Sequence, residues 1–246
     1  MWASGVTVDG TGHASFNTTA LTVGSHVLTA NFTGAGDCKD SAGDNSAAPH
    51  VVNAATTTLT FTSVDAQDGY VLKSAETSGV GGSVDASTSN AGALRVGDDK
   101  SDRQYKTVVS FDTSTIPDGA TIVSVTLRLR RGTVTGTNPF STHGTAWVDV
   151  QTGGLSGSTT LQGSDFEVAP TVVHGASLTN AASNGAWSEG VLTAAGALAV
   201  NKTGTTQFRI YFELDDNDDV RADYIGYYSG GNANAANRPQ LVVTYQ

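Results

Sequence analysis

The regular alternation of apolar and polar residues constrains this chain more than any other feature. Residues 123–130 carry Val or Leu at every second position, and residues 207–214 carry Phe, Ile or Leu in the same way. Successive side chains of a β-strand point to opposite faces, so both runs predict half-buried strands of an antiparallel sheet. The pattern assigns Val123 and Leu214 to the buried faces. Further strands are predicted at 57–64, 69–74, 106–112, 145–151 and 240–245, a short helix at 193–201 and a helical turn near 159–165.

The composition favours many short strands and excludes several classes of partner. Charged residues make up only 15% of the 246 residues, and the net charge is −10. An acidic chain is poorly suited to nucleic acid, whose phosphates are bound by Lys and Arg. Membrane insertion is not expected either, because no apolar run approaches the ~18 residues needed to span a bilayer. Cys38 is the single cysteine, so no internal disulfide can form.

The chain is predicted to contain two units, residues 1–54 and 55–246, separated at the sequence NAATTT (53–58). The first unit is small for a stable core, with about four predicted strands. It resembles the second half of a bacterial Ig-like repeat, through Leu21, Gly24, His26, Ala30, Phe32, Gly34 and Asp37. The strands that precede these in such a repeat are missing, and no signal peptide is visible at the start. Two explanations stay open: the chain is a fragment of a longer surface protein, or neighbouring molecules supply the missing strands.

The second unit carries several ordered motifs that resemble one family. The matching residues are Asp68, Tyr70, Val71, Leu94, Val96, Gly97, Arg103, Phe111, Asp112, Ile116, Pro117, Ala120, Leu127, Leu129, Arg238, Pro239, Leu241, Val243 and Tyr245. Over about 66–246 the sequence is similar to the DNRLRE-type domain, a jelly-roll β-sandwich found as a non-catalytic, carbohydrate-binding-module-like part of secreted bacterial proteins. Residues 131–206 depart from the family pattern, with only Trp187–Glu189 echoing its Trp-x-Glu segment. The resemblance implies an all-β fold, an antiparallel jelly-roll β-sandwich plus a small partial Ig-like unit, and it implies a structural calcium ion.

Two acidic segments are candidates for that ion: GDDKSDR (97–103) and DDNDD (215–219). Calcium prefers six to eight oxygen ligands, which clustered Asp, Asn and backbone carbonyls can supply. We expect the two loops to converge at strand ends and to offer Asp98, Asp99, Asp102, Asp215, Asn217 and Asp219 as ligands. The second segment lacks EF-hand spacing. Solvated surface acidity, neutralised by Arg103 and Arg221, is an equal alternative.

Exposed aromatic rings are the second kind of candidate site, because sugar C–H faces pack on them. We single out Trp147, Tyr224, Tyr227 and Tyr228 as ligand-binding candidates, with core packing as the alternative. No two of the five histidines have a metal-binding spacing such as HxH or HxxxH, and His26 is interpreted as structural. Neither acidic segment lies beside a histidine or a nucleophile, so catalysis is not expected.

These features predict a non-catalytic, extracellular or cell-surface binding module. Its expected partner is a polysaccharide or cell-surface glycan, with calcium fixing the loops. A structural subunit of a fibre or sheath, self-assembling by strand complementation through the incomplete Ig-like unit, is the alternative. A third hypothesis is an appendage that positions a hydrolase encoded elsewhere on a longer chain.

Overall fold

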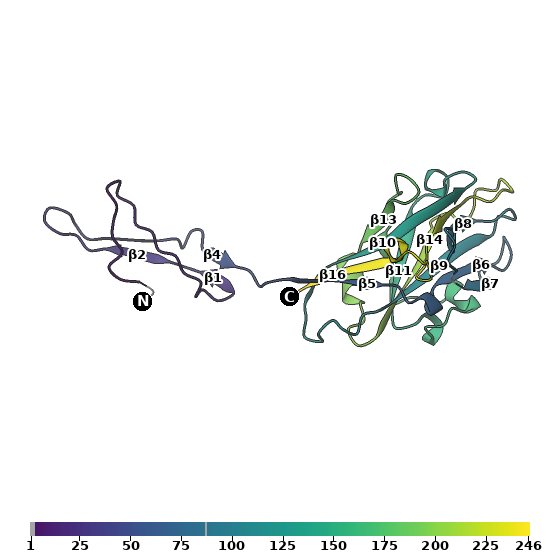
Figure 1. The fold of residues 1–246 in the computed structure, drawn as a ribbon, viewed down its shortest axis with the longest axis horizontal. Helices are drawn as coiled ribbons and strands as arrows, with labels where there is room; N and C mark the ends of the chain where they lie inside the picture. The colour runs from purple at the N-terminus through teal and green to yellow at the C-terminus, as the bar shows by residue number, and fades with distance from the viewer. Residues whose placement is uncertain (1–2, 87) are drawn as a thin grey trace. The chain divides into compact units, whose positions relative to one another are not determined.

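The computed structural model of this chain describes residues 3–86 and 88–246. Its internal contacts divide the chain into unit 1, Met1–Ala55, and unit 2, Thr56–Gln246 (Figure 1). The division lies one residue beyond the boundary expected from the sequence. No helix in the described part of the chain is long and apolar enough to span a bilayer.

Unit 1 consists of two separate two-stranded antiparallel sheets. One pairs β1 (Gly24–His26) with β4 (His50–Val52), and the other pairs β2 (Thr29–Phe32) with β3 (Ser41–Asp44). None of residues 3–55 is buried, and apolar side chains such as Phe16 (51% exposed) and Val23 (64%) face solvent. A two-stranded sheet is marginally stable by itself, and residues 3–55 form strands without a buried core.

Unit 2 is all-β and antiparallel, which confirms the predicted fold class, although the order of strands expected for a jelly roll stays a prediction. Its described residues form one curled, twelve-stranded sheet. The strands are β5 (Thr57–Thr62), β6 (Gly69–Lys73), β7 (Gly81–Ala86), β8 (Leu94–Asp98), β9 (Gln104–Asp112), β10 (Ile122–Thr135), β11 (Ala146–Thr152), β12 (Val172–Ser177), β13 (Trp187–Val191), β14 (Thr205–Phe212), β15 (Tyr224–Tyr227) and β16 (Gln240–Tyr245).

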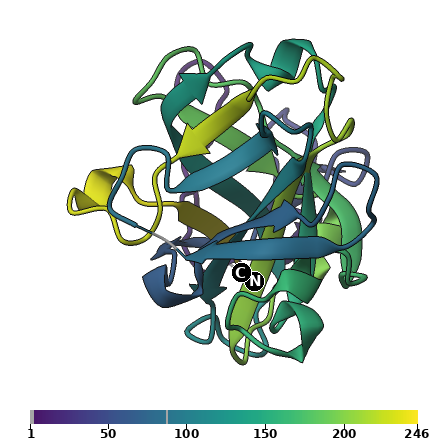
Figure 2. The ribbon, with the colours of Figure 1, turned by 90° about the vertical axis from the view of Figure 1, so that its right-hand side faces the viewer.

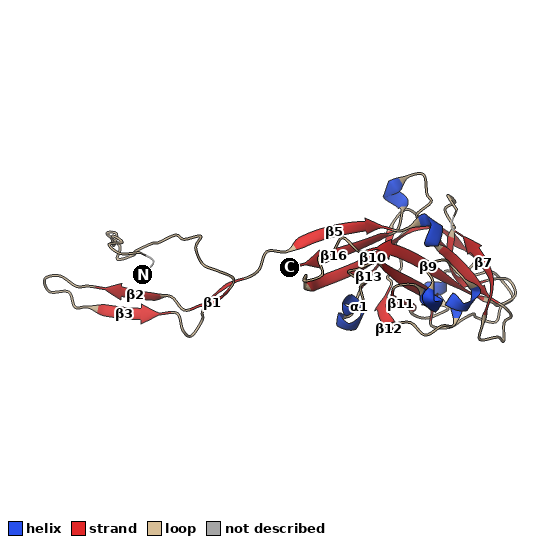
Figure 3. Ribbon diagram, turned by 90° about the horizontal axis from the view of Figure 1, so that it is seen from below, coloured by secondary structure: helices blue, strands red, loops and turns tan. Residues whose placement is uncertain are grey.

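Helical segments are short and lie in the connections (Figure 3). They are η1 (Asp65–Gln67), η2 (Pro139–Ser141), η3 (Leu155–Gly157), η4 (Gly163–Phe166), α1 (Ala194–Leu198) and η5 (Ala235–Asn237). The predicted helix at 193–201 is therefore present but shorter. Its first turn is capped by Thr193, whose side-chain oxygen accepts a hydrogen bond from the Gly196 N–H at 3.1 Å.

The sheet folds over on itself into two layers that enclose the core (Figure 2). One layer contains β5, β16, the first part of β10 and β13, and the other contains β12, β11, β14, β9, β6 and β7. The pair β8–β15 joins the last part of β10 to β9 and completes the curl. Fully buried side chains from both layers meet between them, including Leu127, Leu241, Phe208, Ile210 and Val148. Burial of these apolar faces is what the alternation in the sequence encodes.

Two residues assigned to the core by alternation are exposed instead. Val123 is 53% exposed because the pairing of β10 with β16 shifts register between Ile122 and Ser124, which interrupts the strict period of two. Leu214 is also 53% exposed, because β14 ends at Phe212 and the chain turns away from the sheet. Both differences arise at a strand end or a register shift, and the alternation of apolar residues alone cannot locate either.

Residues 153–170, here named the covering segment, lie over the outer side of β9 and β14. Three polar side chains from these strands fasten it by hydrogen bonds to its backbone. Arg209 donates to the carbonyl oxygens of Asp165, Phe166 and Val168, Lys106 Nζ donates to that of Phe166 at 3.1 Å, and Gln207 bonds to Leu155 and Thr159. Alternation in 207–214 places Gln207 and Arg209 on the face opposite Phe208 and Ile210 and predicts that they face solvent. They are instead buried beneath this segment.

Asp68 joins three parts of unit 2 and gives a first testable prediction. The carboxylate is 1% exposed and accepts hydrogen bonds from Ser63 Oγ (2.6 Å), Ser110 N (3.1 Å) and Gly230 N (2.9 Å). Burial raises the pKa of Asp68 to about 7, although these hydrogen bonds oppose the rise. In the unfolded chain an aspartate releases its proton near pH ~3.9.

The stability of the fold should therefore fall as pH rises from about 4 to 7. In that window the carboxyl group of Asp68 binds fewer protons in the unfolded chain than in the folded one. The free energy of unfolding therefore falls by up to about 1.4 kcal/mol per pH unit because of this group. Urea unfolding of the wild type, Asp68→Asn and Asp112→Asn at pH 5 and pH 7 measures the effect. Asp68→Asn should flatten the slope whatever its absolute stability, while the exposed control Asp112→Asn should keep it. Equal slopes in all three proteins would contradict the assignment.

Candidate functional site

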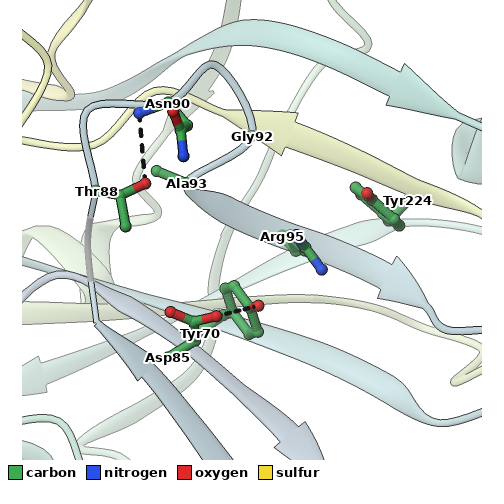
Figure 4. A pocket seen from close by; sticks show the side chains of 8 residues that line it. All are labelled: Tyr70, Asp85, Thr88, Asn90, Gly92, Ala93, Arg95 and Tyr224. Carbon is green, nitrogen blue, oxygen red and sulfur yellow. Dashed lines mark hydrogen bonds between the residues drawn. The ribbon is translucent and has the colours of Figure 1, made fainter.

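A pocket of about 230 Å³ opens where β6, β7, β8 and β15 come together. Its walls are formed by Tyr70, Asp85, Thr88, Asn90, Gly92, Ala93, Arg95 and Tyr224 (Figure 4). The residues between β7 and β8 supply the rim, and the strands supply the larger side chains. Ligand sites in proteins are concave and combine apolar or aromatic walls with a few polar groups, which is the make-up of this pocket.

The guanidinium group of Arg95 is surrounded by tyrosine rings. Its central carbon lies 5.2 Å from the ring centre of Tyr70, 5.6 Å from that of Tyr105 and 5.0 Å from that of Tyr224. The rings also contact one another edge to face, with centres 5.1 Å apart for Tyr70–Tyr105 and 5.6 Å apart for Tyr105–Tyr224. Cation–π and edge-to-face contacts of this kind hold the side chains in fixed orientations.

Polar groups of the pocket are only partly engaged. Tyr70 donates a 2.6 Å hydrogen bond to Asp85, and burial together with this bond raises the pKa of Tyr70, which keeps its hydroxyl protonated. Arg95 donates one long hydrogen bond, 3.4 Å from Nη1 to the Tyr105 hydroxyl, and its buried Nε has no partner in the described structure. None of the described carboxylates forms a salt bridge with Arg95. Arg95 therefore has N–H groups that can donate hydrogen bonds to a ligand. One carboxylate oxygen of Asp85 accepts the hydrogen bond from the Tyr70 hydroxyl.

The four aromatic residues singled out from the sequence lie in different environments in the structure. Only Tyr224 lines the pocket. Tyr227 is 1% exposed and belongs to the core, so it cannot offer a ring face to a ligand, and that expectation is corrected. Tyr228 is half-buried outside the pocket, and Trp147 stacks on His174 with ring centres 4.2 Å apart, which covers one face of the indole.

The two acidic loops do converge, as the sequence led us to expect. Asp98 N donates to the carbonyl oxygen of Asp223 at 3.0 Å, and Asp223 N donates to Asp98 Oδ1 at 2.9 Å. Val220 N donates to Asp102 Oδ1 at 3.0 Å. Gly97 permits this approach, since a Cβ there would lie 2.1 Å from the Asp223 carbonyl oxygen.

Most of the six candidate calcium ligands already have protein partners. Asp99 binds Arg103 (2.6 Å), Asp215 binds Lys73, Asp102 accepts from the Val220 N–H, and Asp219 accepts from the Arg221 N–H (2.9 Å). No group of three His, Cys, Asp or Glu side chains within residues 3–86 and 88–246 is arranged to hold a metal. Four of the six candidates are thus engaged in contacts within the protein.

Two candidates nevertheless have buried oxygens without a partner. Asp98 is fully buried and its Oδ2 accepts no hydrogen bond, and Asn217 Oδ1 is likewise unsatisfied. The sequence placed no histidine beside either acidic segment, and the fold corrects this: His143 is fully buried with its Nε2 3.7 Å from Asp98 Oδ1. Buried polar atoms normally have a partner. Asp98 Oδ2 and Asn217 Oδ1 are oxygens of the kind that coordinate Ca²⁺ or accept a hydrogen bond from water.

Sequence reasoning missed the main pocket residues Arg95 and Asp85. Both lie in strands where they look like ordinary outward-facing polar residues. A charged residue between the apolar Leu94 and Val96 is the only local signal for Arg95. The tyrosines around it, Tyr70, Tyr105 and Tyr224, come from three separate segments of the sequence, so only the folded chain reveals the group.

No protein-family model matches the chain, and no curated protein matches it either.

Proposed function

We propose that this chain is a non-catalytic binding module for a polysaccharide or cell-surface glycan and that it acts outside the cell or at the cell surface. The observation that carries this proposal is the pocket walled by Tyr70, Tyr224 and Arg95. Tyr224 is the half-buried tyrosine of the wall and offers ring surface to sugar C–H groups, while the buried ring of Tyr70 supports Arg95. Arg95, Asn90 and Thr88 provide donors and acceptors for ring hydroxyls.

The chemistry of the pocket favours binding over catalysis. Asp85 is the one acid among the residues that line it, and its carboxylate accepts a hydrogen bond from Tyr70. Glycoside hydrolysis generally uses two carboxyl groups about 5–9.5 Å apart across the scissile bond. The pocket offers one, and this supports the non-catalytic proposal.

A structural calcium ion is a second part of the proposal. Asp98 and Asn217 would hold it, because these are the candidates whose buried oxygens lack protein partners. When bound, the ion would neutralise the buried Asp98 carboxylate and join the loops 97–103 and 215–223. The other four candidates keep the roles that the structure gives them.

A strand-complemented fibre or sheath subunit is the alternative function, and one observation favours it. Unit 1 has no buried residue among 3–55 and presents exposed strands. Free strand edges can pair with another chain. Sedimentation from low to high micromolar concentration tests this alternative: growing assemblies support it, and a strict monomer throughout contradicts it.

A glycan screen tests the leading proposal. The fluorescently labelled 246-residue chain is applied to immobilised polysaccharides and oligosaccharides, and Tyr224→Ala is applied in parallel. We expect binding to one group of related glycans, reduced at least tenfold in the variant. Binding to none of them, or equal binding by Tyr224→Ala, would contradict the proposed pocket.

A further inference from the structure

The pairing of β1 with β4 brings two histidines together that are 24 positions apart in the sequence. The register places His26 directly opposite His50, next to the pairs Ser25–Val51 and Gly24–Val52. Directly opposite residues of an antiparallel pair lie on the same face, with Cβ atoms about 4.5–5.5 Å apart. His26 is half-buried and His50 is exposed, so both imidazoles can be reached from solvent.

The hydrogen bonding of His26 sets its ring up as a metal ligand. Its Nε2 lies 2.6 Å from the carbonyl oxygen of Thr22. A carbonyl oxygen only accepts, so Nε2 carries the proton and Nδ1 keeps a free lone pair. Histidines that bind metals commonly donate their second ring N–H to a backbone carbonyl in this way, which fixes the tautomer and the ring orientation. The ring of His50 has no hydrogen bond to any described residue, which leaves it free to bind.

We propose that His26 and His50 form half of a zinc site and that a second copy of this chain supplies the other two imidazoles. Neutral imidazole suits Zn²⁺, and structural zinc sites are four-coordinate and tetrahedral. The pair supplies two ligands, and no third His, Cys, Asp or Glu of the described chain joins it. The same pair on a symmetric partner completes the set of four, because a twofold axis through the ion presents identical residues from both sides.

The open surface of unit 1 makes this arrangement sterically accessible. None of residues 3–55 is buried, and the neighbour of His50 in β4, Val51, is 58% exposed. The partner copy would lie against the face that carries His26 and His50, whereas alternation places Val51 on the opposite face, so the metal ion holds the two copies together. This inference does not depend on glycan binding, which is assigned to unit 2, and it differs from strand complementation because it requires a metal ion.

The test is the mass of the 246-residue chain with and without zinc. Analytical ultracentrifugation at 20 µM protein compares EDTA-treated samples with samples containing 10–100 µM ZnCl₂, and calorimetry measures the stoichiometry. We expect the mass to double with zinc, to return on adding EDTA, and to need half an ion per chain. Magnesium at the same concentration should have no effect, because it prefers oxygen ligands.

Three single variants make the test specific. His26→Gln and His50→Gln should each weaken zinc-dependent association at least tenfold. His13→Gln is the matched control, since His13 is an exposed histidine of the same unit whose ring bonds to Thr11 Oγ1 at 2.9 Å. It should associate like the wild type. An unchanged mass in zinc, binding of one ion per chain without association, or an equal loss in His13→Gln would each overturn the proposal.

Discussion

Arg209→Ala should lower the free energy of unfolding by about 3–5 kcal/mol, the effect expected when one partner of a buried ion pair is removed. The Arg209 and Asp149 side chains are 6% and 1% exposed and lie 2.6 Å apart. Arg209 also donates to three carbonyl oxygens of the covering segment. The variant would leave the Asp149 carboxylate buried without its positively charged partner. It would also remove the hydrogen bonds that hold residues 165–168 to β14.

Equilibrium unfolding in urea measures this loss, with Arg128→Ala as the matched control. Arg128 is 29% exposed, and its partner Glu189, at 2.6 Å, is 46% exposed. Exposed ion pairs contribute about 0–1 kcal/mol, and Arg128 also packs over Trp187 at 4.7 Å and bonds to Gln240 at 3.1 Å, so the control should lose clearly less than Arg209→Ala. Hydrogen exchange should also become faster at 165–168 in Arg209→Ala. Equal, small losses in both variants would show that Arg209 does not fasten the covering segment.

Removal of calcium should lower the melting temperature by roughly 10 °C. A ligand that binds only the folded state stabilises it by RT ln(1 + [L]/Kd), which is about 4 kcal/mol for a micromolar site in 2 mM calcium. For a unit of this size 1 kcal/mol corresponds to roughly 2–4 °C. On the proposed calcium binding, the stabilisation would come from the ion compensating the buried Asp98 carboxylate, whose Oδ2 otherwise has no hydrogen-bond partner.

Thermal unfolding in 2 mM CaCl₂ and in excess EDTA tests this, with variants chosen from the structure. Asp98→Asn combined with Asn217→Ala should abolish the difference between the two conditions. Asp219→Ala should retain it, because Asp219 is exposed and bonds only to the backbone of its own turn. Identical melting curves of the wild type in calcium and in EDTA would show that no calcium ion stabilises the fold. The two loops would then be a hydrogen-bonded acidic surface.

The fold class could be predicted because apolar alternation is a local property. The runs around Leu127 and Phe208 form the strands β10 and β14 and pack against each other in the core. Deviations arose where a register shift or a strand end decides burial, as at Val123 and Leu214. Burial of Gln207 and Arg209 could not be read from alternation, because it is caused by the covering segment, which lies elsewhere in the sequence.

The candidate sites were predictable to a smaller degree. Convergence of the two acidic loops followed from their position at strand ends, but which carboxylates already bind Lys73 or Arg103 depends on distant residues. Tyr224 was identified by its residue type, whereas Arg95 gains its role only from tyrosines brought in by β6, β9 and β15. The pairing of His26 with His50 was missed because cross-strand neighbours have no fixed spacing in sequence.

We propose that a glycan binds in the pocket of unit 2 formed around Arg95, Tyr70 and Tyr224. Titration calorimetry with a glycan found in the screen, on the wild type, Tyr224→Ala and Tyr228→Ala, tests this binding most directly. Tyr224 lines the pocket and Tyr228 does not, although both are half-buried tyrosines four residues apart. We expect Tyr224→Ala to weaken binding at least tenfold, equivalent to about 1.4 kcal/mol, and Tyr228→Ala to bind like the wild type. A larger loss in Tyr228→Ala than in Tyr224→Ala would place the binding site elsewhere and contradict the account.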